Sequence, residues 1–508
     1  MNSDQNNIEG DNGIRFELPQ LRLDLLSRVS RMYIIWLLIT IPISYVIYRI
    51  DWGSADNATK PAVFFYFVIL IVHLIKRLFK GGWFNILAPD IIFVAIYTMF
   101  QMAYMLFWVL HLAPYSDWII FSETSIPRSF LIINLGLTGF IFGFEFFGTW
   151  REPRTIATHV ESPSNGWGII GFGLIMVGIL MHVGALIGVG IGVFLQNGYT
   201  AVARLNEYAT GIWPIIWIRS LPVVWLGLTL YIISSSLRYK KLFQSKFVLG
   251  ATAAIFLLII LEGDRGPLFL MILILILVRH YYVKPFKVRF FVLLAFIILS
   301  LFAGMKIVRS RALSPIEMLE EYRYAHHSEL RHWSDPFVEA GGTYQIANIT
   351  AMLVPDNQSY WYGASWLDAI IHTVPFLQGL AFKAGMTAEA PAVWITTEIV
   401  GPGGAGLGFS LPAEGYLNFG FPGAFVQMMI FGLFIRRIAI WFSLNPSMFK
   451  AFVFLGILAP TIKVIRDHIS LVTPLYGQIF ILAVILYFLC ERQPHYTYKP
   501  DEIYRVSY

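Results

Sequence analysis

Charged side chains are scarce in this sequence. Asp, Glu, Lys and Arg make up 13% of its 508 residues and apolar residues make up 57%, whereas a soluble chain carries about a quarter charged residues. Cysteine is almost missing: Cys490 is alone, which excludes an intramolecular disulfide, so a domain outside the membrane would hold by packing. Residues 1–30 contain no apolar run, so no cleavable signal peptide is expected. These shortages indicate a multi-span membrane protein.

Long apolar runs are abundant. A bilayer core of about 30 Å needs about 20 apolar residues per helix. The sequence therefore predicts an all-α polytopic membrane protein of about 12 transmembrane helices. One long connection, residues 306–414, interrupts the otherwise short spacing and has the pattern of a helical loop. The predicted spans are residues 31–50, 61–79, 86–112, 129–150, 167–193, 214–234, 247–262, 266–283, 288–305, 415–436, 448–462 and 470–490.

Lys and Arg residues are distributed unevenly among the connections. Most of the 37 fall in alternate connections, beginning with the N-terminal segment, which predicts that both chain ends are cytoplasmic and the long connection extracytoplasmic. The expected organisation is a cytoplasmic segment 1–30, a bundle 31–305 of spans one to nine, an extracytoplasmic helical loop domain 306–414, spans ten to twelve within 415–490, and a cytoplasmic tail 491–508.

A glycine run stands at the end of the long connection. Residues 401–406, GPGGAG, fit G-x-G-x-x-G, the pattern of a dinucleotide-binding turn. Such a turn follows a strand in a βαβ unit, whereas this run is extracytoplasmic and leads into a span. A nucleotide site is therefore not expected. The glycines would instead let the backbone approach a lipid-linked sugar, or another helix, closely.

The long connection contains signals for three helices. Residues 314–317, SPIE, have the order of a capping box with proline at the first helical position. A second helix is expected to begin at residues 335–336, DP, and to continue to Val354. Ser365 is expected to cap a third helix, which stops before Pro375.

Aromatic residues cluster between the second and third of these helices. They are Tyr360, Trp361, Tyr362 and Trp366. Trp and Tyr concentrate at the membrane–water interface, and aromatic faces also suit the apolar faces of sugar rings. Composition does not separate the two interpretations, and the interface is the favoured one.

Arginines recur on the extracytoplasmic side, against the positive-inside pattern. Buried or half-buried charge in a membrane protein is energetically costly and usually functional. The guanidinium group binds phosphate oxygens bidentately. The group therefore indicates an anionic lipid head group as partner. Local ion pairs, such as Arg265 with Glu262 or Asp264, are the alternative for any single member. The arginines are Arg265, Arg309, Arg311, Arg323, Arg331 and Arg466.

Carboxylates and histidines on the same side are candidate bases. His326, His327 and His332 lie close together in sequence, but no H-E-x-x-H or similar zinc spacing occurs. A solvated helix face is the favoured interpretation, and no metal site is expected. The candidates are His326, His327, His332, Asp335, Glu339, His372, Glu414, Asp467 and His468.

An ordered set of motifs spans about residues 260–480. GDRG at 263–266 is followed by Arg309, by EAG at 339–341, by Pro355, Tyr360 and Gly363 in a P…Y..G.S pattern, by IIHTVP at 370–375, and by GLGFSLPAEGYLNFG at 406–420. In this order they resemble the Wzy-type oligosaccharide repeat-unit polymerases, the O-antigen polymerases. The N-terminal half matches only in being a string of spans.

This resemblance implies a GT-C-like glycosyltransferase of the bacterial inner membrane. It would transfer a growing glycan from undecaprenyl pyrophosphate to a lipid-linked repeat unit at the outer face. Arg265, Arg309 and Arg466 would bind pyrophosphate, and Arg311 and Arg323 would belong to the same substrate-binding set. Such arginines would stabilise the charge that develops on the leaving oxygens.

The resemblance also implies roles for the acceptor side. Glu339 is the first candidate for the general base, and His327 and His468 are the next candidates. Glu414 and Tyr416 would shape the acceptor site. No cofactor, nucleotide or obligatory metal is expected, because the leaving group carries the driving force. Partners would be the lipid-linked donor and acceptor, membrane lipids and a chain-length regulator, with no nucleic acid.

Three other activities remain as alternatives. An O-antigen ligase shares this build and moves the finished glycan to lipid A core. A lipid-linked oligosaccharide flippase needs charges inside the spans and often two related halves, whereas in-span charge is sparse here, with Glu145 and Arg219 the main cases. An acyl or phospho-group transferase could use a similar outer site.

Overall fold

The structure is a computed structural model. It describes residues 23–81, 85–112, 123–146, 165–190, 211–262, 265–286, 340–373, 377, 380, 389–401, 408–443 and 447–490. Every regular element in these ranges is helical. The elements are α1 Leu23–Arg49, α2 Ala55–Gly81, α3 Pro89–Gln101, α4 Ala103–Val109, η1 Glu123–Ser125, α5 Ile126–Phe146, α6 Asn165–Val189, α10 Trp213–Tyr239, α11 Lys246–Glu262, α12 Arg265–Val278, η2 Arg279–Val283, α16 Thr343–Leu353, α17 Ala364–Thr373, α19 Pro391–Val400, α20 Leu411–Ser443, α21 Met448–Leu458, α22 Thr461–Arg466 and α23 Ile469–Cys490.

Within the described ranges, eight helices are long and apolar enough to cross a membrane, or nine if α3 and α4 form one bent span. This confirms an all-helical polytopic protein. The predicted spans 31–50 and 247–262 fall on α1 and α11, whose apolar parts are shorter. The predicted span 288–305 lies outside the described residues, so the total of twelve and the GT-C-like build stay predictions.

The third predicted span, 86–112, is not one straight helix. The axis turns by 56° between α3 and α4, at Met102, which has a non-helical φ of −128°. The predicted span therefore contains a bend that the sequence does not indicate, because neither glycine nor proline marks it.

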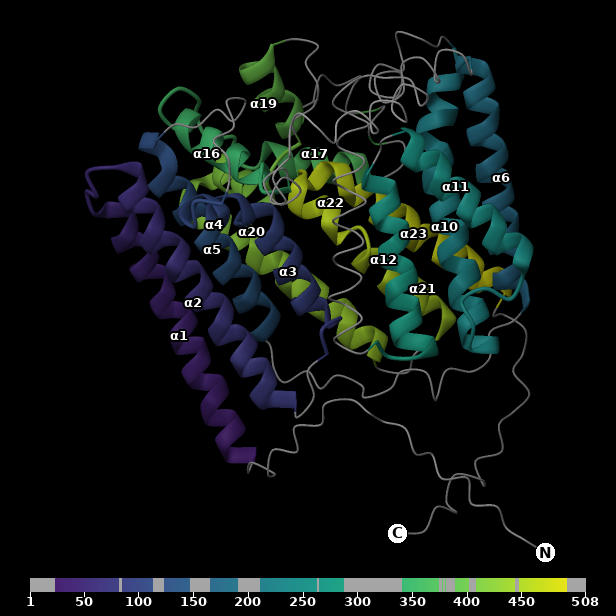
Figure 1. Cartoon of the computed structure of the whole chain (residues 1–508), viewed down its shortest axis with the longest axis horizontal. Coiled ribbons are helices and arrows are strands. Elements are labelled where there is room, and N and C mark those ends of the chain that lie inside the picture. The colour runs from purple at the N-terminus through teal and green to yellow at the C-terminus, as the bar shows by residue number, and fades with distance from the viewer. Residues whose placement is uncertain are drawn as a thin grey trace, which may run out of the picture.

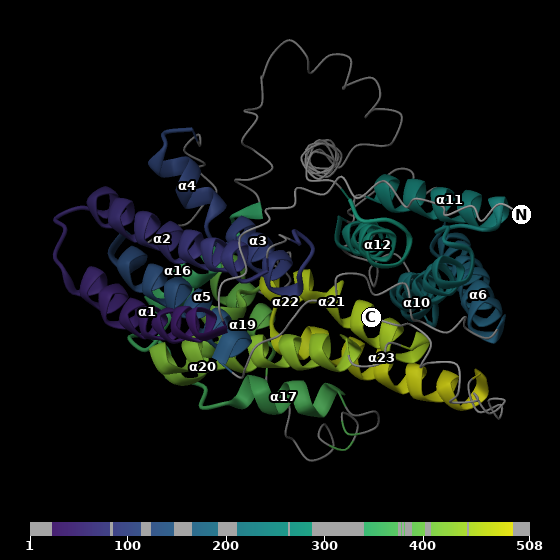
Figure 2. The same cartoon turned by 90° about the horizontal axis from the view of Figure 1, so that it is seen from below.

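Two groups of helices make up the bundle. Figure 2 shows α1, α2, α5, α16 and α20 on one side and α6, α10, α11 and α12 on the other. Helices α21 and α23 contact members of both groups. The first group is held by close packing of α5 on α20, where Gly143 meets the backbone of Met429 and Gly432 meets that of Phe140. A side chain at either glycine would separate the helices.

Helices α16, α17 and α19 gather at one end of the bundle, where α1 ends and α5 begins (Figure 1). They belong to the connection predicted to be helical. The second predicted helix contains α16, which spans Thr343–Leu353, and its predicted start at 335–336 lies outside the described residues. The third spans Ala364–Thr373 and ends before Pro375 as predicted. The prediction that Ser365 caps this helix was wrong, because Ser365 lies inside it. The helix predicted to begin at 314–317 is outside the described residues.

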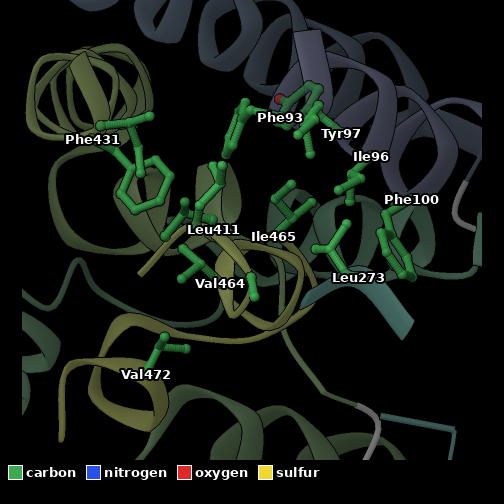
Figure 3. Packing of buried hydrophobic residues seen from close by; sticks show 14 of the residues in the cluster. Phe93, Ile96, Tyr97, Phe100, Leu273, Leu411, Phe431, Val464, Ile465 and Val472 are labelled. Carbon is green, nitrogen blue, oxygen red and sulfur yellow. The ribbon is translucent and has the colours of Figure 1, made fainter. Parts of the chain in front are cut away.

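The short helix α22 lies within the apolar core. Val464 and Ile465 are buried, and Figure 3 shows them among side chains of α3, α12 and α20, including Leu273 and Leu411. This packing fixes the turn that follows α22 and leads into α23.

Candidate functional site

Helix α20 is broken near its start. Phe419 and Gly420 leave helical geometry, with Gly420 at φ 66° and ψ −155°. The sequence explains the break, because Pro422 has no N–H to donate to the carbonyl of Asn418 four residues earlier. Gly420 also adopts a backbone conformation that side-chain-bearing residues avoid. The break divides α20 into a short segment, Leu411–Asn418, and a long one that continues to Ser443.

The carbonyl groups exposed by the break are satisfied by the turn between α16 and α17. Trp361 N donates to Leu417 O at 3.0 Å, and Tyr362 N donates to Asn418 O at 3.1 Å. Gly363 N donates to the side-chain oxygen of Asn418 at 3.0 Å. Residues 360–363, which we call the capping turn, thus supply the N–H donors that this helix end lacks.

Glu414 lies fully buried in the short segment of α20. Its Oε2 accepts hydrogen bonds from Gln427 Nε2 at 3.2 Å and from Ile469 N at 2.8 Å. Gln427 belongs to the long segment, and Ile469 is the first residue of α23. The carboxyl group therefore joins both halves of the broken helix to a helix N-terminus, where negative charge is favoured.

Asn418 and Ser365 complete the surroundings of this carboxyl group. Asn418 Nδ2 donates to Ser365 Oγ and to the backbone oxygen of Glu414, both at 2.8 Å. Ser365 is also a side-chain hydrogen-bond partner of the Glu414 carboxyl group. Because all three side chains are fully buried, this polar network is costly unless its hydrogen bonds are made.

The turn between α22 and α23 lies against the end of the glycine run. Phe409 N donates to Arg466 O at 3.0 Å. Ser410 Oγ donates to Gln101 Oε1 at 3.1 Å, and Gln101 Nε2 donates to Ile465 O at 3.3 Å. The motif residues after Gly408 are thus held on this turn by backbone and amide contacts, while the Arg466 side chain is exposed.

Titratable side chains of the same turn and of α17 face one another. His372 Nδ1 lies 3.2 Å from Asp368 Oδ1, and the Asp368 charge also acts on His468 and Glu414. Burial lowers the pKa of His468 to about 4, with Asp368 opposing and His372 adding to the shift. Burial raises the pKa of Asp467 against the effects of Arg466 and Lys463. His468 is therefore neutral near pH 7, although the Asp368 carboxylate acts on it.

A pH dependence of stability follows for His468. Its pKa is about 4 in the fold and about 6.5 in an unfolded chain, so the unfolded state binds more protons between these values. Stability is then lost as pH falls from about 7 to 4, by about 3 kcal/mol at most. When the pH is lowered from 7.5 to 4.5, the unfolding temperature in detergent should drop more for the wild type than for His468→Gln. Equal drops would contradict the assignment.

Four residues predicted for the site are described with their side chains. Glu414 and His468 lie near one another in the fold, because the backbone of Ile469, the residue after His468, donates to the Glu414 carboxyl group. Arg466 belongs to the same turn. Tyr416 is placed differently. It is buried and its hydroxyl donates to Val354 O at 3.0 Å, so it links α20 to the end of α16.

The other predicted site residues cannot be placed in this geometry. Glu339, His327, Arg309, Arg311 and Arg323 lie outside the described residues, as does the side chain of Arg265. Gly341 packs directly on the backbone of Tyr104 at the α3–α4 bend. This close contact fixes where the chain following Glu339 joins the bundle. Glu262, one alternative partner of Arg265, has His182 Nε2 as a partner at 2.5 Å.

Several members of the polar network were not predicted. Asn418 lies within the motif GLGFSLPAEGYLNFG, so its position was marked without a role. Gln427 was signalled only by being an amide inside an apolar span. Ser365 was predicted only as a helix cap, and Asp368 gave no signal beyond its place in a short helix. Their contacts depend on how α17 packs on α20 and α23.

These features define an integral membrane protein whose broken helix holds a buried carboxyl group at one end of an all-helical bundle. The family model for the O-antigen polysaccharide polymerase Wzy matches residues 30–493, most of the chain. The chain belongs to this family, as the motifs indicated. Membership implies an O-antigen polymerase that uses lipid-linked oligosaccharides in a membrane. Comparison with curated proteins and with solved structures gave no match.

Proposed function

We propose that this protein is a glycosyltransferase that polymerises undecaprenyl-pyrophosphate-linked repeat units at the outer face of the bacterial inner membrane. Family membership supports polymerisation of lipid-linked oligosaccharide. The observation that carries the site is the buried Glu414 at the break of α20, inside the motif GLGFSLPAEGYLNFG and bonded to Gln427 and to the first residue of α23.

The distribution of charge along the bundle supports the outer placement. Lys76 and Arg77 lie within five residues of the end of α2 at Gly81, and Arg436 lies seven residues before the end of α20 at Ser443. These two helix ends point away from α16, α17 and α19 (Figure 1). Basic residues favour the cytoplasmic side. The end that carries the capping turn and Glu414 is then extracytoplasmic, with both chain ends in the cytoplasm.

The proposed reaction is one displacement. An acceptor hydroxyl oxygen forms a bond to the anomeric carbon of the donor glycan, while the bond from that carbon to a pyrophosphate oxygen breaks. The electron pair of the broken bond leaves with the lipid pyrophosphate, and the hydroxyl proton passes to a base. A preorganised donor to the leaving oxygens is worth about 10²–10³ in rate.

Arginines are the proposed donors to the leaving oxygens. Arg466 is exposed at the α22–α23 turn beside the motif, where its fork of N–H groups suits a phosphate. We retain Arg265, Arg309, Arg311 and Arg323 as further members of this set.

The proposed acceptor side centres on Glu414 and His468. A neutral imidazole accepts a proton, and His468 Nδ1 is buried without a hydrogen-bond partner among the described residues. Glu414 would orient the acceptor hydroxyl. Glu339 remains the first candidate for the base and His327 a further one, because general bases of these types need only lie within hydrogen-bond reach of the hydroxyl.

Glycan length in a deletion strain tests the proposed function. Without this protein, the lipid A core should carry a single repeat unit, and re-expression should restore long chains. Long polymer that stays unligated would indicate the O-antigen ligase. Precursor trapped in the inner leaflet would indicate the flippase. Either result would overturn the proposal.

A further inference from the structure

An apolar groove opens beside the break of α20. Its volume is about 540 Å³, within the range of ligand sites, and it is open on one side. Three helices line it, and no charged side chain does. The lining residues are Ile41, Pro42 and Tyr45 of α1, Leu131 and Leu135 of α5, and Phe421, Pro422 and Phe425 of α20.

The depth of the groove places it in one leaflet. Tyr45 lies four residues before the end of α1 at Arg49, and Leu135 lies nine residues after the start of α5 at Ile126. At 1.5 Å per residue the groove lies about 6–14 Å below these helix ends. This is the half of a bilayer core of about 30 Å that adjoins the capping turn.

A positive charge stands above the groove. Arg128 lies on α5 one helical turn before Leu131, with its side chain 25% exposed. Its Nη1 donates to Ala351 O and Val354 O and to Asp356, which is itself largely exposed. An anionic head group at the top of the groove would compete with the exposed Asp356 carboxylate for this guanidinium group.

Aromatic contacts connect the groove to the capping turn. The Phe421 ring lies 5.1 Å from that of Tyr416, which lies 6.1 Å from that of Tyr360. Tyr48, one turn above Tyr45, lies 5.5 Å from Phe421. A molecule with its chain in the groove would thus have its head beside residues 360–363, which cap the segment that holds Glu414.

We propose that this groove binds the polyisoprenyl chain of the lipid-linked glycan, with its phosphate end near Arg128. The inference rests on the proposed function for the identity of the lipid. Its chemistry is that of a long, branched hydrocarbon with an anionic head, held by burial of apolar surface at about 25 cal/mol per Å². An ordinary phospholipid chain is the competing occupant.

Photolabelling of the full-length protein in vesicles tests this assignment. Two probes carry the same photoreactive group, one on a polyprenyl phosphate and one on phosphatidylglycerol. The polyprenyl probe should label peptides of α1, α5 and α20 and be displaced by undecaprenyl phosphate. Equal labelling by both probes, without displacement, would show a lipid-facing surface and overturn the proposal.

A matched pair of variants locates the site. Ile41→Trp places a large ring in the groove and should reduce polyprenyl labelling about tenfold. Ile39→Trp adds the same ring to α1 at a position 45% exposed and outside the groove, and should leave labelling unchanged. Loss of labelling in both variants, or in neither, would contradict the assignment.

Labelling and polymer length are measured separately, so the two proposals can fail separately. A protein that polymerises normally while polyprenyl labelling of the groove is absent overturns the groove and leaves the function standing. If the purified protein is labelled in the groove, but the strain that lacks it still makes glycan of normal length, the polymerase function is overturned and the lipid site stands.

Discussion

Glu414→Gln is expected to lower the rate of polymerisation by about 10²–10³, with little change in the fold. The glutamine oxygen can still accept from Gln427 Nε2 and Ile469 N, the two donors that the carboxylate oxygen has now. What changes is the second oxygen, Oε1, which becomes an N–H donor. If Glu414 orients the acceptor hydroxyl, that hydroxyl loses its acceptor. Polymer formation from purified lipid-linked repeat units measures the effect.

Two further substitutions separate chemistry from folding. Glu414→Ala leaves Ile469 N without its acceptor, whereas Gln427 Nε2 keeps Leu411 O at 3.1 Å. The lost hydrogen bond costs about 1–3 kcal/mol, so this variant should also unfold at lower temperature. Glu398→Gln, on an exposed face of α19 at the same end of the bundle, should retain both activity and stability. A Glu414→Gln protein with wild-type polymerisation would remove Glu414 from the acceptor site.

Composition and hydropathy were sufficient to predict the class of fold, because a bilayer selects for long apolar helices whatever their tertiary contacts. The exceptions are informative. The bend between α3 and α4 at Met102 contains neither glycine nor proline, so the sequence does not indicate it. Helix α17 was predicted with its end correct and its cap wrong, because Ser365 is engaged by Asn418 rather than by the N–H groups of its own helix.

The site was predicted in part for a similar reason. Motif order marked Glu414, although it placed this residue at the end of a loop, whereas it lies in the first turn of α20. Its burial depends on Gln427, thirteen residues further along, and on Ile469, which belongs to another helix. Contacts of this kind arise from the break at Gly420 and the packing of α23, which local sequence does not encode.

Asn418→Leu is expected to lower both the stability and the activity of the protein. The substitution removes the donors to Ser365 Oγ and Glu414 O and the acceptor for Gly363 N. Buried groups left without partners cost about 1–3 kcal/mol each, so a loss of about 3 kcal/mol is expected. The capping turn would then shift relative to Glu414, and a displacement of about 1 Å can cost about 10²-fold in rate.

Asn418→Asp separates the two effects. The carboxylate keeps an acceptor for Gly363 N but loses both donors, and it adds negative charge next to Glu414. The capping turn should therefore stay in place and the unfolding temperature should fall less than in Asn418→Leu, while polymerisation should remain low. Asn57→Leu is the matched control, because Asn57 is exposed on α2 and surface substitutions usually change stability by about 0.5 kcal/mol or less. If Asn418→Asp polymerised as the wild type does, the Asn418 donors would have no part in positioning Glu414, and its importance would be limited to holding the turn.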